Sequence, residues 1–330
     1  MIKTQIIPTK KPFPIWLMRQ SGRYLPEYKV LREKYSFMEI LKNPELIANL
    51  TLLPLKHFDL DALIIFSDIS IFFSLLEGIE YDIVENIGPV VKIHEDIKKI
   101  KIKSNSEILD SLKTAIKIVT QEKKLPLIGF IGGIYTLIHY LTKNSNLDKT
   151  FIYSNEDFLF LIIEGLYKIA RLQIEAGADI IQIFDTYLFD LSPVDIEFYI
   201  LPYYKMLLNK IKAEYPQIPL ILFSLNTFHI IDYIKEFNID CLSVDWKKDL
   251  DIYFNNFEGF VQGNLDPHIL TIQCRDTFQK MLNLSLLRIF KSIEENESRY
   301  IFNVGHGLLP NTKIENIQFL IEKINEYKGG

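Results

Sequence analysis

The chain repeats one pattern along its length: a short apolar run, a polar or glycine break, and then a stretch with helical spacing. Seven of these runs are four to seven residues long, and an eighth has three residues. Apolar runs of this length are typical of strands that are buried on both faces of a parallel sheet. The eight runs are Ile15–Met18, Ala62–Phe66, Leu125–Ile131, Ala178–Phe184, Pro219–Phe223, Ile239–Val244, Gly259–Val261 and Ile301–Val304.

Eight strand candidates that alternate with helices predict an α/β fold, a single-domain (β/α)8 TIM-type barrel over residues 1–330. A doubly wound open sheet is the structural alternative, because short apolar runs are ambiguous. The helical stretches include Asn155–Ala176, with Ser154 as its candidate N-cap. Thr312 and Glu315 form a capping-box pattern at the start of the last helical stretch.

Composition and charge limit the partners of such a barrel. The net charge of −5 gives no general attraction to nucleic acid or to an anionic membrane, so an anionic ligand would need arginines gathered in a cleft. We expect neither a membrane span nor a signal peptide, because the apolar stretches are short and the first residues carry lysines instead of an apolar region. Two cysteines, Cys241 and Cys274, favour a reducing cytoplasm over a disulfide scaffold. HExxH and CxxC spacings do not occur, and we predict no metal site.

The residues that directly follow the apolar runs are mostly polar. In a barrel of this type the active site lies at the carboxyl ends of the strands, so these residues should meet in one ring. The ring would contain two arginines, a histidine and several carboxylates. Its members are Arg19 and Arg23, Asp68, Gly132, Asp185 and Thr186, Ser224, Asp245, Asn264 and His306.

The first of these breaks reads Arg19-Gln20-Ser21-Gly22-Arg23. An arginine presents a rigid fork of donors that matches a carboxylate or phosphate at two points. Gly22 allows the backbone to approach a ligand closely or to take a positive φ. The segment is therefore a candidate anion site, with a basic turn paired to acidic neighbours as the alternative.

The longer string from Pro14 to Tyr28 resembles the N-terminal signature of the uroporphyrinogen decarboxylase family, with Ser21 where the family usually has alanine. Gly133-Ile134-Tyr135 departs from the Ala-Pro-Trp of that family, and Ser224 lies where a lysine-containing form is usual. The resemblance extends over about residues 12 to 325, and its motifs occur in the expected order. The other matching segments are Ile64–Asp68, Gly129–Tyr140, Gln182–Thr186, Val244–Trp246, Gln262–Pro267 and Gly305–Pro310.

The resemblance implies cofactor-independent decarboxylation of the four acetate side chains of uroporphyrinogen III to coproporphyrinogen III, in haem biosynthesis. It implies a homodimer that uses no metal or organic cofactor, and we expect this homodimer in the cytoplasm that the two cysteines favour. Asp68 would be the central catalytic carboxylate, which accepts pyrrole N–H groups and stabilises a protonated pyrrole, and Arg19 and Arg23 would be catalytic as well. The substrate-binding residues would be Arg19, Gln20, Ser21, Gly22, Arg23, Asp68, Tyr140, Phe184, Thr186 and His306.

Other interpretations of these residues remain open from the sequence. An aspartate just after a strand is a common helix N-cap, which would give Asp68 a structural role. A zinc- and corrinoid-dependent methyltransferase of the same superfamily would need thiolate and imidazole ligands, and the two cysteines lie 33 residues apart without an HxC motif. A non-catalytic tetrapyrrole-binding protein would use the same arginines and aspartate, and release of CO2 distinguishes it from an enzyme.

Overall fold

A computed structural model describes residues 6–84, 87–122, 124–143, 145 and 147–327. In these residues a curled sheet of seven parallel strands follows the order β1-β4-β5-β6-β7-β8-β9. This order runs with the chain and lacks the reversal of a doubly wound sheet, so the α/β barrel prediction is confirmed. All seven strands fall on predicted apolar runs: β1 (Leu63–Ile64), β4 (Leu127–Gly132), β5 (Ile180–Phe184), β6 (Leu220–Phe223), β7 (Cys241–Ser243), β8 (Phe260–Leu265) and β9 (Tyr300–Val304).

The eighth predicted run, Ile15–Met18, lies between the two edges of this sheet. Ile15 forms a parallel bridge with Phe302 of β9, and its carbonyl accepts a bond of 2.8 Å from the Asp61 amide, just before β1. The segment is not a regular strand because side chains take several of its N–H groups. Asp61 Oδ2 accepts from the Ile15 amide, and Asn303 Oδ1 accepts from the Met18 amide.

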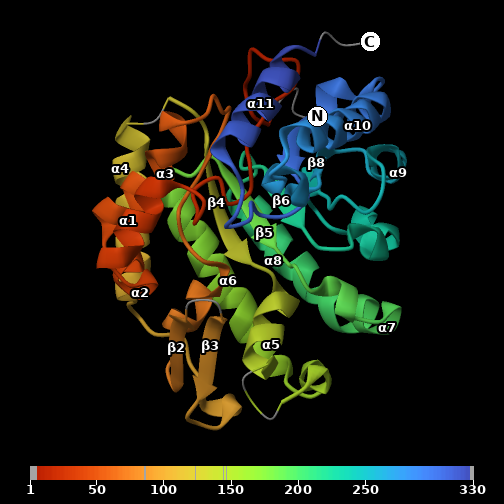
Figure 1. The fold of residues 1–330 in the computed structure, drawn as a ribbon. Coiled ribbons are helices and arrows are strands. Elements are labelled where there is room, and N and C mark those ends of the chain that lie inside the picture. Colours follow the sequence, from red (N-terminus) through yellow and green to blue (C-terminus); the bar gives the residue numbers. More distant parts are fainter. Residues whose placement is uncertain (1–5, 85–86, 123, 144, 146, 328–330) are drawn as a thin grey trace.

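Helices and short helical turns surround the sheet (Figure 1). The α-helices are α1 (Pro26–Lys34), α2 (Phe37–Leu41), α3 (Pro44–Leu52), α4 (Glu107–Glu122), α5 (Ile134–Lys143), α6 (Glu156–Ala176), α7 (Pro193–Asp195), α8 (Leu201–Glu214), α9 (Leu250–Asn256), α10 (Arg275–Ile293) and α11 (Ile314–Asn325). The turns are η1 (Leu53–Lys56), η2 (Ile69–Leu75), η3 (Ile97–Lys99), η4 (Lys149–Tyr153), η5 (Leu188–Asp190), η6 (Ile196–Ile200), η7 (Thr227–Glu236), η8 (Pro267–Thr271) and η9 (Glu297–Arg299).

A two-stranded antiparallel hairpin, β2 (Ile79–Val84) and β3 (Gly88–Ile93), is an element that the sequence analysis did not predict. It lies beside α5 at the bottom of Figure 1, at the opposite end of the molecule from α11. Strand β2 packs against η2, and β3 packs against α5. The hairpin therefore lies at the edge of the sheet where β1 and β4 end.

Two helix starts differ by one residue from the prediction. Asn155 is the N-cap of α6, because the amide of Ser154 donates to the Phe151 carbonyl and so ends the preceding turn η4. Lys313 is the N-cap of α11, and Thr312 instead accepts a bond of 3.1 Å from the Leu309 amide. The capping box was wrong, because the threonine closes the turn before the helix.

One contiguous cluster of buried apolar side chains runs from Ile6 to Ile324, which supports the prediction of a single domain. A short polar network lies inside the barrel. The Trp16 indole donates to Gln262 Oε1 at 2.8 Å, and the Gln262 amide donates to Ser243 Oγ at 2.9 Å. These bonds attach the segment Ile15–Met18 to strands β7 and β8. This barrel-closing segment leads directly into Arg19.

Candidate active site

The predicted site residues lie at the carboxyl edge of the parallel sheet. Asp68 follows β1, Thr186 follows β5 and His306 follows β9. Arg19 follows the barrel-closing segment, and Tyr140 projects from α5, which begins just after β4. The topology therefore collects residues that are more than 280 positions apart in the chain.

Arg19 is an exposed cation in a constrained backbone conformation. Its φ is 59°, a left-handed value that is uncommon for a residue with a side chain. The side chain lies over Gly307, where an added Cβ would be 2.4 Å from the Arg19 Cδ. Among the described residues, no carboxylate lies within ion-pair distance of Arg19. The guanidinium is thus held by packing and remains available to an anion from solution.

The other residues of the loop differ in their surroundings. Gln20 is fully buried; its Oε1 accepts from the Leu17 amide, and its Nε2 donates to the Ala62 carbonyl. Its side chain therefore ties the loop to the barrel instead of facing a ligand. Ser21 is half-buried and Arg23 is exposed. Glu27, four residues after Arg23, has its Oε1 3.0 Å from His57 Nε2.

Asp68 is half-buried and caps the turn η2. Its Oδ1 accepts a 2.8 Å bond from the Ser70 amide and a second bond from the Ser70 hydroxyl. The N-cap interpretation is therefore correct for one carboxylate oxygen. Among the described residues Oδ2 accepts no hydrogen bond, so it can accept from a ligand.

Tyr140 lies within electrostatic range of Asp68 and Arg19. Burial raises the pKa of Tyr140, the nearby Asp68 and Tyr187 raise it further, and Arg19 lowers it. The ring of Tyr140 also meets that of Tyr187, with centroids 6.0 Å apart. The ring of Tyr187 stacks on His139, with centroids 3.8 Å apart and planes at 6°. Tyr187 is a site residue that the sequence analysis missed, although it directly follows Thr186 in the loop after β5.

Asp185 explains the glycine-rich segment at the start of α5. This buried carboxylate accepts a 2.7 Å bond from the Thr136 amide and a 2.6 Å bond from the Tyr204 hydroxyl. Burial raises the pKa of Asp185, and these donors oppose the rise. A Cβ on Gly133 would lie 2.1 Å from the Asp185 Cβ, so glycine is required here. Gly133 therefore lets Asp185 hold α5, and with it Tyr140, at the edge of the sheet.

Phe184 and His306 form the apolar side of the site. The rings of Phe184 and Phe223 are 5.8 Å apart, and those of Phe223 and His306 are 6.2 Å apart. Burial, and then the charge of Arg19, lower the pKa of His306 to about 4. His306 is therefore neutral near pH 7 and can exchange hydrogen bonds without adding charge. Thr186 is half-buried, and its carbonyl accepts from the Leu225 amide.

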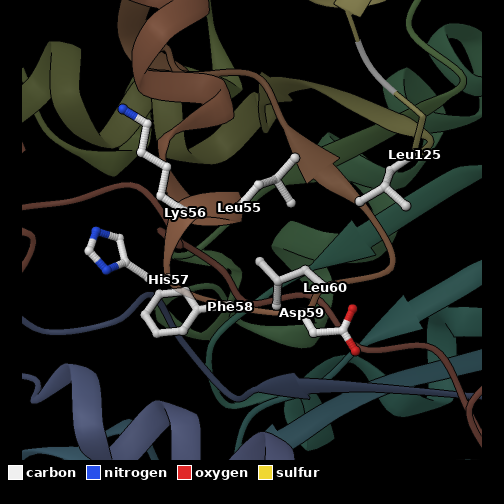
Figure 2. Close-up of a pocket in the computed structure, with 7 residues that line it drawn as sticks. All are labelled: Leu55, Lys56, His57, Phe58, Asp59, Leu60 and Leu125. Carbon is white, nitrogen blue, oxygen red and sulfur yellow. The ribbon is translucent and has the colours of Figure 1, made fainter.

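A hollow at the other edge of the sheet is separate from these residues. It is lined by the stretch before β1 and by a leucine before β4 (Figure 2), namely Leu55, Lys56, His57, Phe58, Asp59, Leu60 and Leu125. Active sites of barrels lie at the carboxyl ends of the strands, and this hollow is at the amino ends. It therefore does not belong to the candidate active site.

In the ranges given above, the histidine, cysteine, aspartate and glutamate side chains do not form any group of three or more that could hold a metal ion. Cys241 is buried in β7, and Cys274 is exposed just before α10. None of the described helices is long and apolar enough to cross a membrane.

Comparison with known proteins places these features in a family. The profile of the family "Uroporphyrinogen decarboxylase (URO-D)" matches residues 8–327. The chain is 36% identical to the uroporphyrinogen decarboxylase of Thermodesulfovibrio yellowstonii, over 96% of this chain and 94% of that protein. It is 34% identical to the same enzyme of Aquifex aeolicus, with 96% and 94% covered.

Solved structures show the same fold at lower identity. A methyltransferase from Methanosarcina mazei superposes with a TM-score of 0.75 at 19% identity, over 97% of this chain and 94% of that one. A putative vitamin-B12-independent methionine synthase from Listeria monocytogenes superposes with a TM-score of 0.63 at 15% identity, over 99% and 100%. Likeness at this identity concerns the fold alone.

Proposed function

The chain belongs to the uroporphyrinogen decarboxylase family, and we propose that Asp68 and Arg19 are the centre of its active site. The protein is a carboxy-lyase that decarboxylates uroporphyrinogen in porphyrin biosynthesis. The observation that carries the site assignment is the Asp68 carboxylate after β1, whose Oδ1 is bonded to Ser70 while its Oδ2 accepts no hydrogen bond from the described residues. Its charge acts on Tyr140, as does that of Arg19. The proposed substrate is the III isomer, whose four acetates become methyl groups to give coproporphyrinogen III.

The macrocycle suits this arrangement of charges. Its pyrrole N–H groups can turn inward and converge on one carboxylate, and Oδ2 of Asp68 is the acceptor that faces them. Its eight carboxylates lie at the periphery, where Arg19 can bind one at two points. Arg23 and the Thr186 hydroxyl would contact further carboxylates, and Phe184 would pack against a pyrrole face.

Decarboxylation at each acetate then needs a proton and a place for an electron pair. Protonation of a pyrrole carbon gives a cation, the bond to the carboxylate breaks, and its electrons move into the ring as CO2 leaves. The acetate methylene carbon that CO2 has left takes a proton and becomes a methyl group, and the ring loses the proton that it had gained. Each step therefore consumes one proton and releases one CO2. Asp68 stabilises the cation because a fixed anion close to a developing positive charge lowers the barrier.

Cofactor independence follows from this chemistry, since the pyrrole itself accepts the electron pair. Ser21 and Gly22 would shape the loop so that Arg19 and Arg23 point toward the substrate, and Gln20 would hold that loop in place. His306 would donate or accept a hydrogen bond as a neutral imidazole.

We also propose a cytoplasmic homodimer. Val194 and Phe198, on α7 and η6, are 58% and 62% exposed, and Phe228 on η7 is 42% exposed. The Tyr233 hydroxyl of η7 donates to the Pro193 carbonyl, so these elements are neighbours. Sedimentation of the parental protein should show a dimer, and Phe198→Asp should weaken its association. A monomer in sedimentation of the parental protein would contradict the proposed dimer. Cell fractionation tests whether the protein lies in the cytoplasm.

The test of the site is Asp68→Asn. Asparagine keeps the shape and one acceptor but removes the charge, and turnover should fall by about a hundredfold or more. Asp148 is a matched control, because it caps η4 in the same way and accepts from the Thr150 amide and hydroxyl away from the site. Asp148→Asn should retain parental turnover. Near-parental turnover of Asp68→Asn would contradict the catalytic role of Asp68 and leave it only as the N-cap of η2.

A further inference from the structure

Two residues outside the predicted site, Ser70 and Tyr81, connect the hairpin to Asp68. Ser70 is fully buried, and both its amide and its hydroxyl donate to Asp68 Oδ1. The Tyr81 hydroxyl lies 3.0 Å from Ser70 Oγ. The Tyr81 ring is 6.1 Å from Phe73 of η2, so packing as well as hydrogen bonding fixes the tyrosine. The three side chains form a continuous chain from β2 to the carboxylate.

The direction of the hydrogen bonds follows from the number of protons. A serine hydroxyl has one hydrogen and can accept through its lone pairs. Asp68 can only accept while it is ionised, so the Ser70 hydrogen points to Oδ1. Tyr81 must then donate to Ser70, and burial together with the charge of Asp68 raises the pKa of Tyr81 well above its ordinary value, which keeps that proton in place.

We infer that Ser70 and Tyr81 are positioning residues that hold the Asp68 carboxylate with Oδ1 committed to the protein and Oδ2 directed to the substrate. This inference rests on the proposed role of Asp68. It gives the β2–β3 hairpin a function, because docking of the hairpin places the Tyr81 hydroxyl, which donates to Ser70. Since a hydroxyl that accepts a hydrogen bond becomes a better donor, Tyr81 strengthens the bond from Ser70 to Asp68.

The expected consequence is a change in turnover more than in substrate binding. We call the hydrogen bonds from Tyr81 to Ser70 and from Ser70 to Asp68 the relay. The peripheral carboxylates of the substrate still meet the arginines when the relay is broken, so KM should change little. The carboxylate would rotate more freely, and misplacement of a charged group close to the reacting atoms reduces the rate. Loss of a hydrogen bond to a charged group makes a decrease of roughly tenfold in kcat reasonable for Ser70→Ala.

The experiment compares Ser70→Ala, Ser70→Thr, Tyr81→Phe and the double variant Ser70→Ala/Tyr81→Phe in steady-state assays with uroporphyrinogen III. We expect Tyr81→Phe to lower kcat by about threefold, and the double variant to be no slower than Ser70→Ala, because residues of one network are not additive. Ser70→Thr keeps the hydroxyl and should restore most of the rate. Thr150→Ala is the matched control, since Thr150 donates to Asp148 in the same geometry away from the site.

The outcomes separate this inference from the proposed site. Parental kcat in both Ser70→Ala and Tyr81→Phe, with Asp68→Asn inactive, would overturn the relay and leave the site intact. Parental turnover in Asp68→Asn would overturn the site itself. Additive losses in the double variant, or equal losses in Thr150→Ala, would show a general stability effect and contradict the relay. If Ser70→Ala does not fold, Tyr81→Phe decides alone, because it removes one oxygen and keeps the ring.

Discussion

Replacement of His306 by glutamine should reduce the loss of stability that the protein suffers as the pH falls below neutral. Burial, and then Arg19, lower the pKa of His306 from 6.5 to about 4 in the folded protein. In the unfolded chain the imidazole has its ordinary pKa, so the unfolded state takes up the proton first as the pH falls. The folded state is therefore destabilised progressively between the unfolded and the folded pKa, and it loses nothing further below the folded one.

The shift of His306 sets the size of this effect. With a folded pKa of about 4 and an unfolded one of 6.5, the linkage relation gives a loss of about 2 kcal/mol at about pH 5 relative to neutral pH. Urea unfolding of the parental protein and of His306→Gln at these two pH values measures it. The parental free energy of unfolding should fall by about 2 kcal/mol more than that of the variant.

The arginine beside the imidazole provides a second variant for this experiment. Arg19→Gln should recover only the smaller part of the effect, because burial is the larger cause of the shift. Equal pH dependence in the parental protein and in His306→Gln would refute the placement of a neutral, buried imidazole beside Arg19.

Three further predictions concern the arginines, the start of α5 and metals. Arg19→Lys and Arg23→Lys should each lower kcat far more than affinity, because lysine lacks the two-point fork, and partly decarboxylated intermediates should accumulate in chromatography. Full parental turnover in both variants would make these arginines structural. Gly133→Ala should destabilise the protein by about 1–3 kcal/mol in urea unfolding, because its Cβ would lie 2.1 Å from the Asp185 Cβ, and an unchanged midpoint would contradict that packing. Dialysis against a strong chelator should leave activity unchanged, and a loss that zinc alone restores would favour methyltransferase-like chemistry.

The strands of the barrel could be predicted because each is buried on both faces and therefore appears as a continuous apolar run. The hairpin was missed because its strands are half exposed and carry charged residues. Strand β2 alternates buried or half-buried Ile79, Tyr81 and Ile83 with exposed Glu80 and Asp82, a period of two that would have indicated a strand. A search for continuous apolar runs does not detect that signal.

The candidate site could be predicted only where position along the chain determines position in space. Asp68 and His306 follow directly on strands, so the barrel topology brings them to one edge. Gln20 was expected to contact the substrate, yet its side chain bonds to Leu17 and Ala62, because loop geometry decides which way an amide points. Tyr81 reaches Asp68 through docking of the hairpin, a tertiary contact that local sequence does not encode.

The most direct test of the account is a crystal structure of the protein with coproporphyrinogen III bound. We predict that the pyrrole N–H groups converge on Asp68 Oδ2 at hydrogen-bond distances of about 3 Å, with a propionate on the Arg19 guanidinium. Oδ1 should keep its bonds to Ser70. A macrocycle that lies away from Asp68, for example in the hollow beside Leu55 and Leu60 at the amino ends of the strands, would contradict the central claim.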